Sequence, residues 1–443
     1  MSQTIKIKKG LDIPMHGKAA ARIENLPAAT AAIVPDDFPG HVWKCVVKEG
    51  DDVAEGSPLL IDKATGKIRL VAPLEGKVSE IRRGPRRKIL AVVVKKTTTA
   101  AETPAYSLKA DPQSVRQTLL ESGLWALMRQ RPFDIVPSPD CTPRDIFISA
   151  FDSAPLAPEL FDRTDIPAIE KGLEILTILS GKKPYVATRK ETGVEFANAE
   201  NLLMEGPHPA GNTGVQIAAT SPVNKGETVF TLNITTVARI GRLYSEGKPD
   251  WTTLVAVTGP ATDDPHIIET TVGASIEPLI SSSLHAGSSG LRVISGNVLT
   301  GTKADPATGF LRYPYIQITV IKEGADADEF MGWASMSPMK YSVKRTFPAF
   351  LRRLGASFDF DARIKGGRRA MILSGEYDKV FPFDIYPEYL IKAILAGDID
   401  RMEKLGIYEV APEDFALPEF VDTSKTDLQD IVRKGLDKVM EEV

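Results

Sequence analysis

The first residues whose types and spacing could do chemistry form a glycine-spaced loop. The segment GPHPAGNTGVQIAA (residues 206–219) places Gly206, Gly211 and Gly214 ahead of an apolar run. Backbone N–H groups of such a loop before a helix can bind a phosphate. However, neither a G-x-G-x-x-G nor a Walker pattern is present, and no lysine follows Gly214. We therefore expect a tight turn that needs positive φ or close packing, with nucleotide binding as the alternative.

A second loop combines a cation, an aromatic ring and a carboxylate. The proline-rich segment RPFDIVPSPDCTPRD (residues 131–145) carries Arg131, Phe133, Asp134 and Ile135 at its start. It follows a predicted helix and precedes the apolar run IFISAF, so we expect it at the rim of a sheet, where α/β proteins bind ligands. The alternative is a proline-stiffened connection with Phe133 in the core.

Cysteine and histidine usage excludes common metal centres. The two cysteines, Cys45 and Cys141, lie in different predicted domains and form no C-x-x-C motif. Four thiolates for an iron–sulfur cluster are therefore not available within this chain. No two of the five histidines have the i, i+4 spacing of a helical zinc site.

Covalent chemistry is suggested by a lysine between two similar β-rich segments. VVKEGDDVAEGSPLLI (residues 46–61) and VAPLEGKVSEI (residues 71–81) follow one pattern and enclose the tripeptide Asp62-Lys63-Ala64. The pattern predicts β-hairpins and resembles the biotinyl/lipoyl carrier fold, whose modified lysine lies in this tripeptide. A swinging arm must start from a hairpin tip. We place the tip near Thr65 and Gly66, with Lys63 on the preceding strand, and expect no attached group.

Composition narrows the classes of partner. The 443 residues have a formal net charge of −4 with both signs interspersed, which argues against a nucleic-acid partner. No run approaches the roughly 18 apolar residues of a membrane span, and the N-terminal sequence does not have the pattern of a secretory signal. The run RRGPRRK (residues 82–88) places five cations at a predicted hairpin tip. It is either a solvated loop or a docking surface for an acidic partner or lipid head groups.

The periodicity beyond residue 105 indicates a multidomain α/β protein. Helical spacing over residues 111–130, the strand 146–151 and an amphipathic helix that ends at Gly181 predict a doubly wound, Rossmann-like sheet. The boundaries that we expect are an N-terminal leader over 1–32, a biotinyl/lipoyl-like domain without attachment lysine over 33–96, the Rossmann-like domain over 105–255, a β-grasp domain over 256–322 and a helical C-terminal domain, including FPAFLRRLG, over 323–443.

Six segments in the same order carry a specific resemblance. They are KIKKGLDIP, the carrier-like domain, RPFDIVPSPDCTPRDIFISAFDSAPLAP, EGPHPAGNTG, RVISGNVLTG and GWASMSPMKYSVKRTF. Together they resemble the NqrA family, which belongs to the bacterial sodium-translocating NADH:quinone reductase, over essentially the whole chain. By this resemblance the fold is similar to the flavin subunit of respiratory complex I, and its β-grasp unit to the soluble-ligand-binding (SLBB) domain.

The resemblance also implies a function and partners. It implies a peripheral subunit on the cytoplasmic face of the bacterial inner membrane, within a six-subunit complex that oxidises NADH and exports sodium. Its ligand would be a quinone, ubiquinone or menaquinone, with no flavin and no iron–sulfur cluster in this chain. The isolated chain would have no catalytic residues of its own and no metal. The alternative is a flavin-binding, NADH-oxidising subunit, which the incomplete glycine loop disfavours.

A quinone head group needs an apolar slot, donors for its carbonyl oxygens and a route for its tail. The second loop offers these types together, because Phe133 can stack, Arg131 can donate, and Ile135 can line the wall beside Asp134. Gly211 and Gly214 would form the opposite wall. We therefore expect these six residues at the quinone site.

Overall fold

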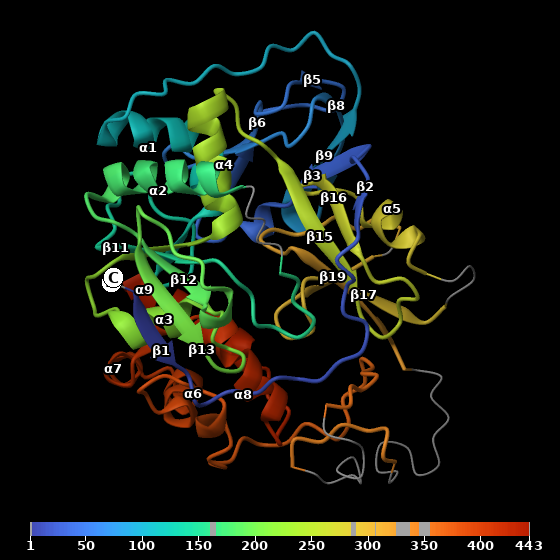
Figure 1. The fold of residues 1–443 in the computed structure, drawn as a ribbon, viewed down its shortest axis with the longest axis vertical. Helices are drawn as coiled ribbons and strands as arrows, with labels where there is room; N and C mark the ends of the chain where they lie inside the picture. The colour runs from blue at the N-terminus through green and yellow to red at the C-terminus, as the bar shows by residue number, and fades with distance from the viewer. Residues whose placement is uncertain are drawn as a thin grey trace.

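The computed structural model describes residues 2–159, 165–284, 289–305, 307–324, 337–344 and 355–442, which fold around three β structures (Figure 1). The first is a six-stranded sheet, called the α/β sheet below, ordered β1-β13-β12-β11-β14-β10. All of its strands are parallel except β10. Their bounds are β1 Gln3–Lys6, β10 Arg129–Arg131, β11 Asp145–Ser149, β12 Tyr185–Arg189, β13 Glu200–Glu205 and β14 Val229–Asn233. The chain moves outward from β11 to β12 and β13 on one side and to β14 on the other, so the order reverses between β11 and β14.

Helices cover both faces of this sheet. On one face lie α1 (Pro112–Glu121), α2 (Ile166–Ser180) and α4 (Ile234–Glu246), and on the other lie α3 (Thr213–Thr220) and the C-terminal helices (Figure 1). The alternation of β11 follows this arrangement, since Ile146 and Ile148 join one core and Phe147 joins the other. Helices α2 and α4 pack at Gly172 and Gly241, where an added Cβ would come within 2.1 Å of a backbone oxygen of the facing helix.

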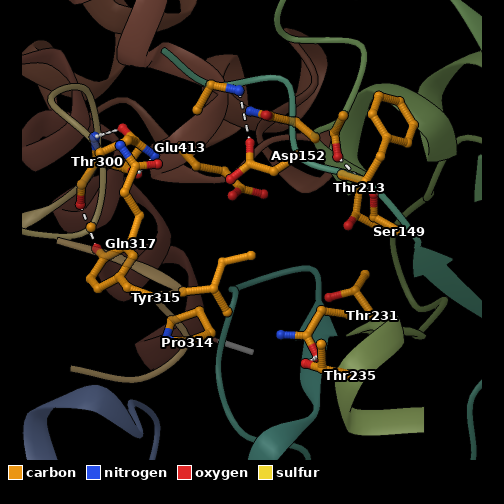
Figure 2. A pocket seen from close by; sticks show the side chains of 18 of the residues that line it. Ser149, Asp152, Thr213, Thr231, Thr235, Thr300, Pro314, Tyr315, Gln317 and Glu413 are labelled. Carbon is orange, nitrogen blue, oxygen red and sulfur yellow. Dashed lines mark hydrogen bonds between the residues drawn. The ribbon is translucent and has the colours of Figure 1, made fainter. Parts of the chain in front are cut away.

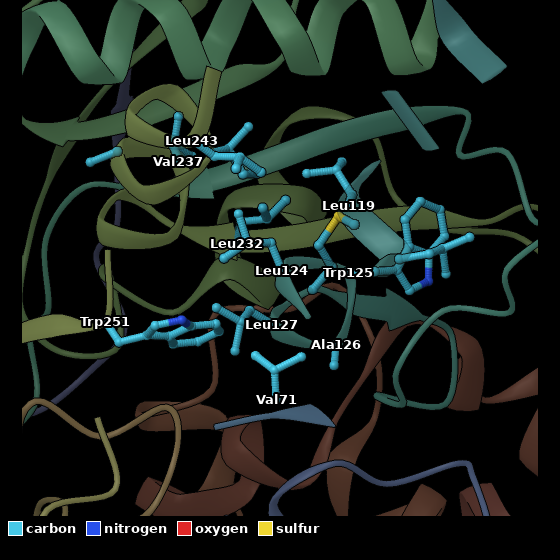
Figure 3. Close-up of a cluster of buried hydrophobic side chains, with 14 of the residues drawn as sticks. Val71, Leu119, Leu124, Trp125, Ala126, Leu127, Leu232, Val237, Leu243 and Trp251 are labelled. Carbon is cyan, nitrogen blue, oxygen red and sulfur yellow. The ribbon is translucent and has the colours of Figure 1, made fainter. Parts of the chain in front are cut away.

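The helix predicted over residues 111–130 is shorter than its periodicity suggests. Helix α1 ends at Glu121, because Gly123 adopts φ 79°, and a 3-10 turn (Leu124–Leu127) leads directly into strand β10. The apolar side chains still enter the core around Trp125 and Trp251 (Figure 3). The hydrophobic spacing therefore predicts burial correctly but not the backbone conformation.

The second β structure is a barrel-sandwich of two antiparallel sheets. One sheet has the order β3-β9-β8-β5 and the other β4-β6-β7. The bounds are β3 Thr30–Ile33, β4 Trp43–Cys45, β5 Asp52–Val53, β6 Pro58–Asp62, β7 Arg69–Val71, β8 Gly76–Arg83 and β9 Ile89–Lys96. Their buried residues share one core with α1, α2 and α4 (Figure 3). The carrier-like unit is thus packed against the α/β unit.

The predicted position of Lys63 was wrong by one residue. Strand β6 ends at Asp62, and Lys63 is the exposed first residue of the turn that joins β6 to β7. Asp62, which is 1% exposed, accepts hydrogen bonds from the backbone and hydroxyl of Thr65 and so closes this turn early. The turn lies beside the α/β unit, where Lys67 Nζ is 2.9 Å from Asp140. A free swinging arm needs a protruding tip, so we still propose that Lys63 is unmodified.

A mixed six-stranded sheet forms the third β structure, in the order β18-β17-β19-β15-β16-β2. One short helix, α5 (Ile276–Ser281), packs on it. The bounds are β2 Ile23–Asn25, β15 Thr252–Thr258, β16 Ile267–Thr271, β17 Leu291–Ser295, β18 Thr302–Ala304 and β19 Gln317–Lys322. The N-terminal segment connects all three structures, since β1, β2 and β3 each join a different one.

The C-terminal part packs against the face of the α/β sheet that also carries α3. It contains α6 (Pro387–Ala396), α7 (Ile399–Lys404), α8 (Ala416–Val421) and α9 (Leu428–Glu442). The helix expected in FPAFLRRLG lies almost entirely outside the described residues. Among the residues described, no helix is long and apolar enough to cross a membrane.

Candidate functional site

The main cavity found within the described parts of the chain has a volume of about 780 Å³. It lies where Ser149, Arg189 and Asn233 end strands β11, β12 and β14. The opposite wall comes from the mixed sheet, through Gln317 of β19, and from the C-terminal part, through Glu413 (Figure 2). This is the carboxyl edge of a parallel sheet at the point where the strand order reverses, which is where open α/β sheets bind ligands.

The glycine loop closes the floor of the cavity. Gln216 Nε2 donates to Ser149 Oγ (3.1 Å) and to the carbonyl oxygen of Gly211 (3.2 Å), which also lies 2.9 Å from Ser149 Oγ. An added Cβ on Gly211 would come 2.7 Å from the backbone nitrogen of Ser153. An added Cβ on Gly214 would come 2.6 Å from Asp414. These two glycines are therefore required for close packing, as the sequence suggested.

His208 is a buried histidine on the cavity wall. The residue is 5% exposed, and its Nδ1 lies 3.0 Å from Ser153 Oγ, which accepts from the backbone of Gly211 at 2.8 Å. Among the described residues, the hydroxyl of Ser153 has the Nδ1 atom of His208 as its acceptor. The imidazole proton then sits on Nε2. Burial lowers the pKa of His208 from 6.5 to about 4, so the ring is neutral near pH 7.

Arg189 and Asp152 line the wall beside it. The guanidinium of Arg189 lies 5.0 Å from the centre of the Phe151 ring, over its face. It also lies 3.4 Å from the backbone oxygen of Asp152. Burial raises the pKa of Asp152, and the backbone of Ala154 donates to its carboxylate at 2.8 Å.

Arg131 belongs to a buried ion pair behind this wall. The side chain is 3% exposed, and its two terminal nitrogens bind Asp414 at 3.0 Å and Glu413 at 2.8 Å. Asp414 is buried, whereas Glu413 is 42% exposed and faces the cavity. Burial raises the pKa of Asp414, and the charge of Arg131 opposes this rise. The pair joins the α/β sheet to the C-terminal part.

Acidic groups outnumber basic groups around the cavity. Its lining holds seven carboxylates and three guanidiniums, namely Asp36, Asp37, Asp134, Asp152, Glu159, Glu191 and Glu413 against Arg129, Arg189 and Arg312. Arg312 is paired with Asp37, and Arg129 donates to backbone carbonyl oxygens. Lys88 and Arg131, which lie outside the lining, pair with Asp36 and Glu413 and reduce the acidic excess without removing it. The remaining excess of negative charge disfavours an anionic ligand and is compatible with a neutral one.

Two of the six residues predicted for the site line this cavity, Asp134 and Gly211. Phe133 packs edge-on against Tyr408, with ring centroids 6.2 Å apart, and Ile135 packs against Gly40. Arg131 and Gly214 lie behind the wall at Asp414.

Arg189, His208 and Glu413 were missed by sequence reasoning, although the fold brings them together on the cavity wall. His208 lies within the glycine loop that was singled out, so its position there was a usable signal. Glu413 is more than 200 residues away in the chain, and no local pattern connects it to the other two.

These features define a class: a multidomain α/β chain with a barrel-sandwich unit and a ligand-sized cavity at the switch point of its sheet. Three family models match it, namely the NqrA N-terminal barrel-sandwich hybrid domain over residues 5–97, the NqrA second alpha/beta domain over 110–249 and the NQRA C-terminal domain, an SLBB model, over 254–305.

Curated relatives give the same result over the full length. The chain is 36% identical to the NqrA subunit of the Na(+)-translocating NADH-quinone reductase of Serratia proteamaculans, with 99% of this chain and 100% of the relative covered. It is 34% identical to that of Pasteurella multocida, with the same coverage. The chain therefore belongs to the NqrA family of Na(+)-translocating NADH-quinone reductase subunits. A NAD+-reducing [NiFe]-hydrogenase structure aligns with a TM-score of 0.40 and 13% identity over 76% of this chain and 64% of that one, too low to support an argument.

Proposed function

We propose that this chain is the quinone-binding peripheral subunit of its complex and that the quinone head group binds in the cavity. The relatives are named as the NqrA subunit of a NADH-quinone reductase, an oxidoreductase complex, so other subunits carry out part of the reaction. In our proposal these are five further subunits, some of them in the membrane, and this chain lies on the cytoplasmic face of the inner membrane. The quinone is ubiquinone or menaquinone.

The observation that carries this proposal is the combination of cavity size and charge. A volume of about 780 Å³ lies in the range of about 300–1,000 Å³ that is typical of small-molecule sites. A quinone head is neutral and carries only acceptor oxygens. The acidic lining tolerates a neutral ligand, and His208 Nε2–H and the Arg189 guanidinium offer donors to carbonyl oxygens. Phe151 adds an aromatic surface.

A flavin-binding subunit is the weaker candidate. The phosphate of FMN needs several cations or free N–H groups. Of the three guanidiniums of the lining, Arg312 already binds Asp37 and Arg129 already binds backbone oxygens, so only Arg189 would be left to neutralise a phosphate. The glycines of the loop serve packing against Ser153 and Asp414. The names of the relatives favour NqrA as well.

The test is to measure, by calorimetry, the binding of a short-chain quinone to the purified chain. Asn212→Trp should fill the cavity, because Asn212 lines it and its side chain makes no capping bond to α3. We expect at least a tenfold loss of affinity, about 1.4 kcal/mol. Gln113→Trp, on the exposed face of α1, is the matched control and should bind as the wild type does. Equal affinity of the wild type and both variants would mean that the quinone does not bind in the cavity. Stoichiometric FMN in the purified chain would mean that the ligand is a flavin.

A further inference from the structure

Among the described residues, the tip of the β8–β9 hairpin is a strongly cationic surface feature. A 3-10 turn (Pro85–Arg87) joins the two strands. Within it, Arg86 and Arg87 have φ of 55° and 61°. Successive left-handed conformations are uncommon for residues with a Cβ and raise the local free energy, so the surrounding contacts must hold them.

Contacts at the base of the hairpin provide this hold. Arg82 bonds to Glu80 and to the backbone oxygen of Thr308, and its guanidinium lies 5.0 Å from the centre of the Phe310 ring. Lys88 Nζ lies 2.8 Å from Asp36. Arg82 and Lys88 are thus neutralised, and they fix the hairpin between the mixed sheet and the segment after β3.

The other three cations remain without a carboxylate. Arg83, Arg86 and Arg87 are exposed and have no acidic partner among the described residues. Arg83 donates only to the backbone oxygen of Arg87, at 3.4 Å. Leu90, 40% exposed, lies against Gly84 beside them. The tip therefore presents three guanidiniums and one apolar side chain on a braced hairpin. Acidic residues exceed basic ones in the whole chain, 58 to 54, so these unpaired cations do not reflect a surplus of positive charge.

We propose that this surface, Arg83, Arg86, Arg87 and Leu90, is a docking site for an acidic surface of another subunit of the complex. Guanidiniums bind carboxylates through paired N–H donors, and a pre-ordered hairpin loses little conformational freedom on binding. A bilayer of anionic lipids is the less favoured occupant. Three cations without a large apolar anchor bind such a surface only weakly and reversibly.

The experiment uses the full chain and membranes that hold the remaining subunits of the complex. Association is measured by co-sedimentation at increasing salt for the wild type and for R83E/R86E/R87E. We expect at least a tenfold weaker association for the variant, and a steep salt dependence in the wild type that the variant lacks. The variant R83K/R86K/R87K keeps the three positive charges and should therefore associate more tightly than R83E/R86E/R87E. Thermal unfolding checks that each protein is folded.

The matched control is K44E/K95E/K96E, which reverses three exposed cations of the same barrel-sandwich unit. It should associate as the wild type does. If the control weakens association equally, the effect is one of net charge and the proposal fails. If vesicles of the same lipids without protein retain the wild type as well as the complete membranes do, the partner is lipid and the proposal is wrong. If R83E/R86E/R87E associates as the wild type does, the hairpin tip is a solvated loop and the proposal is wrong.

Discussion

The two loops singled out in the sequence take different roles, although both lie beside the same cavity. The loop that begins at Arg131 uses its cation internally, in the buried pair with Asp414. The glycine loop places His208 and Gly211 on the cavity wall. Residue types alone favoured the first loop, because it holds a cation, an aromatic ring and a carboxylate. The difference comes from strand direction.

Strand β10 is the antiparallel member of an otherwise parallel sheet. Its last residue, Arg131, pairs with Val229 at the start of β14, whereas its first residue, Arg129, pairs with Thr231 nearer the cavity. The periodicity over residues 111–130 predicts a helix up to the loop that begins at Arg131. It does not predict the antiparallel strand β10, whose direction fixes the position of this loop. Arg131 therefore lies at the end of β10 that is far from the ligand edge, and its side chain reaches the cavity wall only from behind, through Glu413 and Asp414. This teaches that the direction of a strand decides which of its ends can serve a site.

The largest expected effect is on stability and concerns the first loop, whose cation is part of a buried ion pair. Arg131→Met should lower the free energy of unfolding by about 3–5 kcal/mol, because it leaves Asp414 buried without its counter-charge. Chemical denaturation measures this. The control is Arg368→Met, which breaks an ion pair with Asp427 whose side chains are 64% and 55% exposed and should cost less than about 1 kcal/mol. Similar losses in both variants would mean that the buried pair has no special role.

A pH dependence should distinguish the glycine loop. The pKa of His208 falls from 6.5 to about 4 on folding, so between these values the unfolded chain binds a proton that the folded chain does not. Above pH 6.5 the neutral His208 ring costs the folded state nothing. As the pH falls from 6.5 toward 4, protonation of the unfolded chain lowers the free energy of unfolding by up to about 3 kcal/mol. Other carboxyl groups titrate in this range, so the difference between the wild type and His208→Gln is the measurement. Parallel curves would contradict a buried neutral imidazole.

Sequence reasoning reached the fold more closely than the site. The barrel-sandwich unit, the α/β unit and the SLBB unit follow from periodicity and turn residues that are local in the chain. The cavity depends on long-range pairing instead. Glu413 reaches it because Arg131 holds the C-terminal part against the sheet, and Arg189 reaches it only because β12 is parallel to β11. Neither relation has a local pattern, so the site could be predicted only as far as Asp134 and Gly211.

The quinone proposal gives the next smaller effect, on affinity. His208→Leu removes the donor and should weaken binding of a short-chain quinone about tenfold, equivalent to about 1–1.5 kcal/mol. His208→Gln keeps an N–H donor and should recover much of this loss. The hydroxyl groups of the corresponding quinol can donate as well as accept, so its binding depends less on a donor at this position and its affinity should change less. If the wild type binds quinone and His208→Leu binds it equally well, another residue contacts the carbonyl oxygen. If the wild type binds none, the cavity has another ligand.

The smallest effect concerns the one acidic residue through which the first loop reaches the cavity. Asp134 has φ 52°, a left-handed conformation that asparagine tolerates, so Asp134→Asn removes a charge without new backbone strain. The affinity for a neutral quinone should change by less than about twofold, since a neutral head has little interaction with a single charge. A quinone analogue that carries a carboxylate should gain about twofold, equivalent to about 0.4 kcal/mol, as one carboxylate of the lining is lost. Both affinities can be measured by calorimetry at low salt, where screening is weakest. A large loss with the neutral quinone would mean that Asp134 contacts the ligand directly, and the first loop would then share the role that we assign to the second.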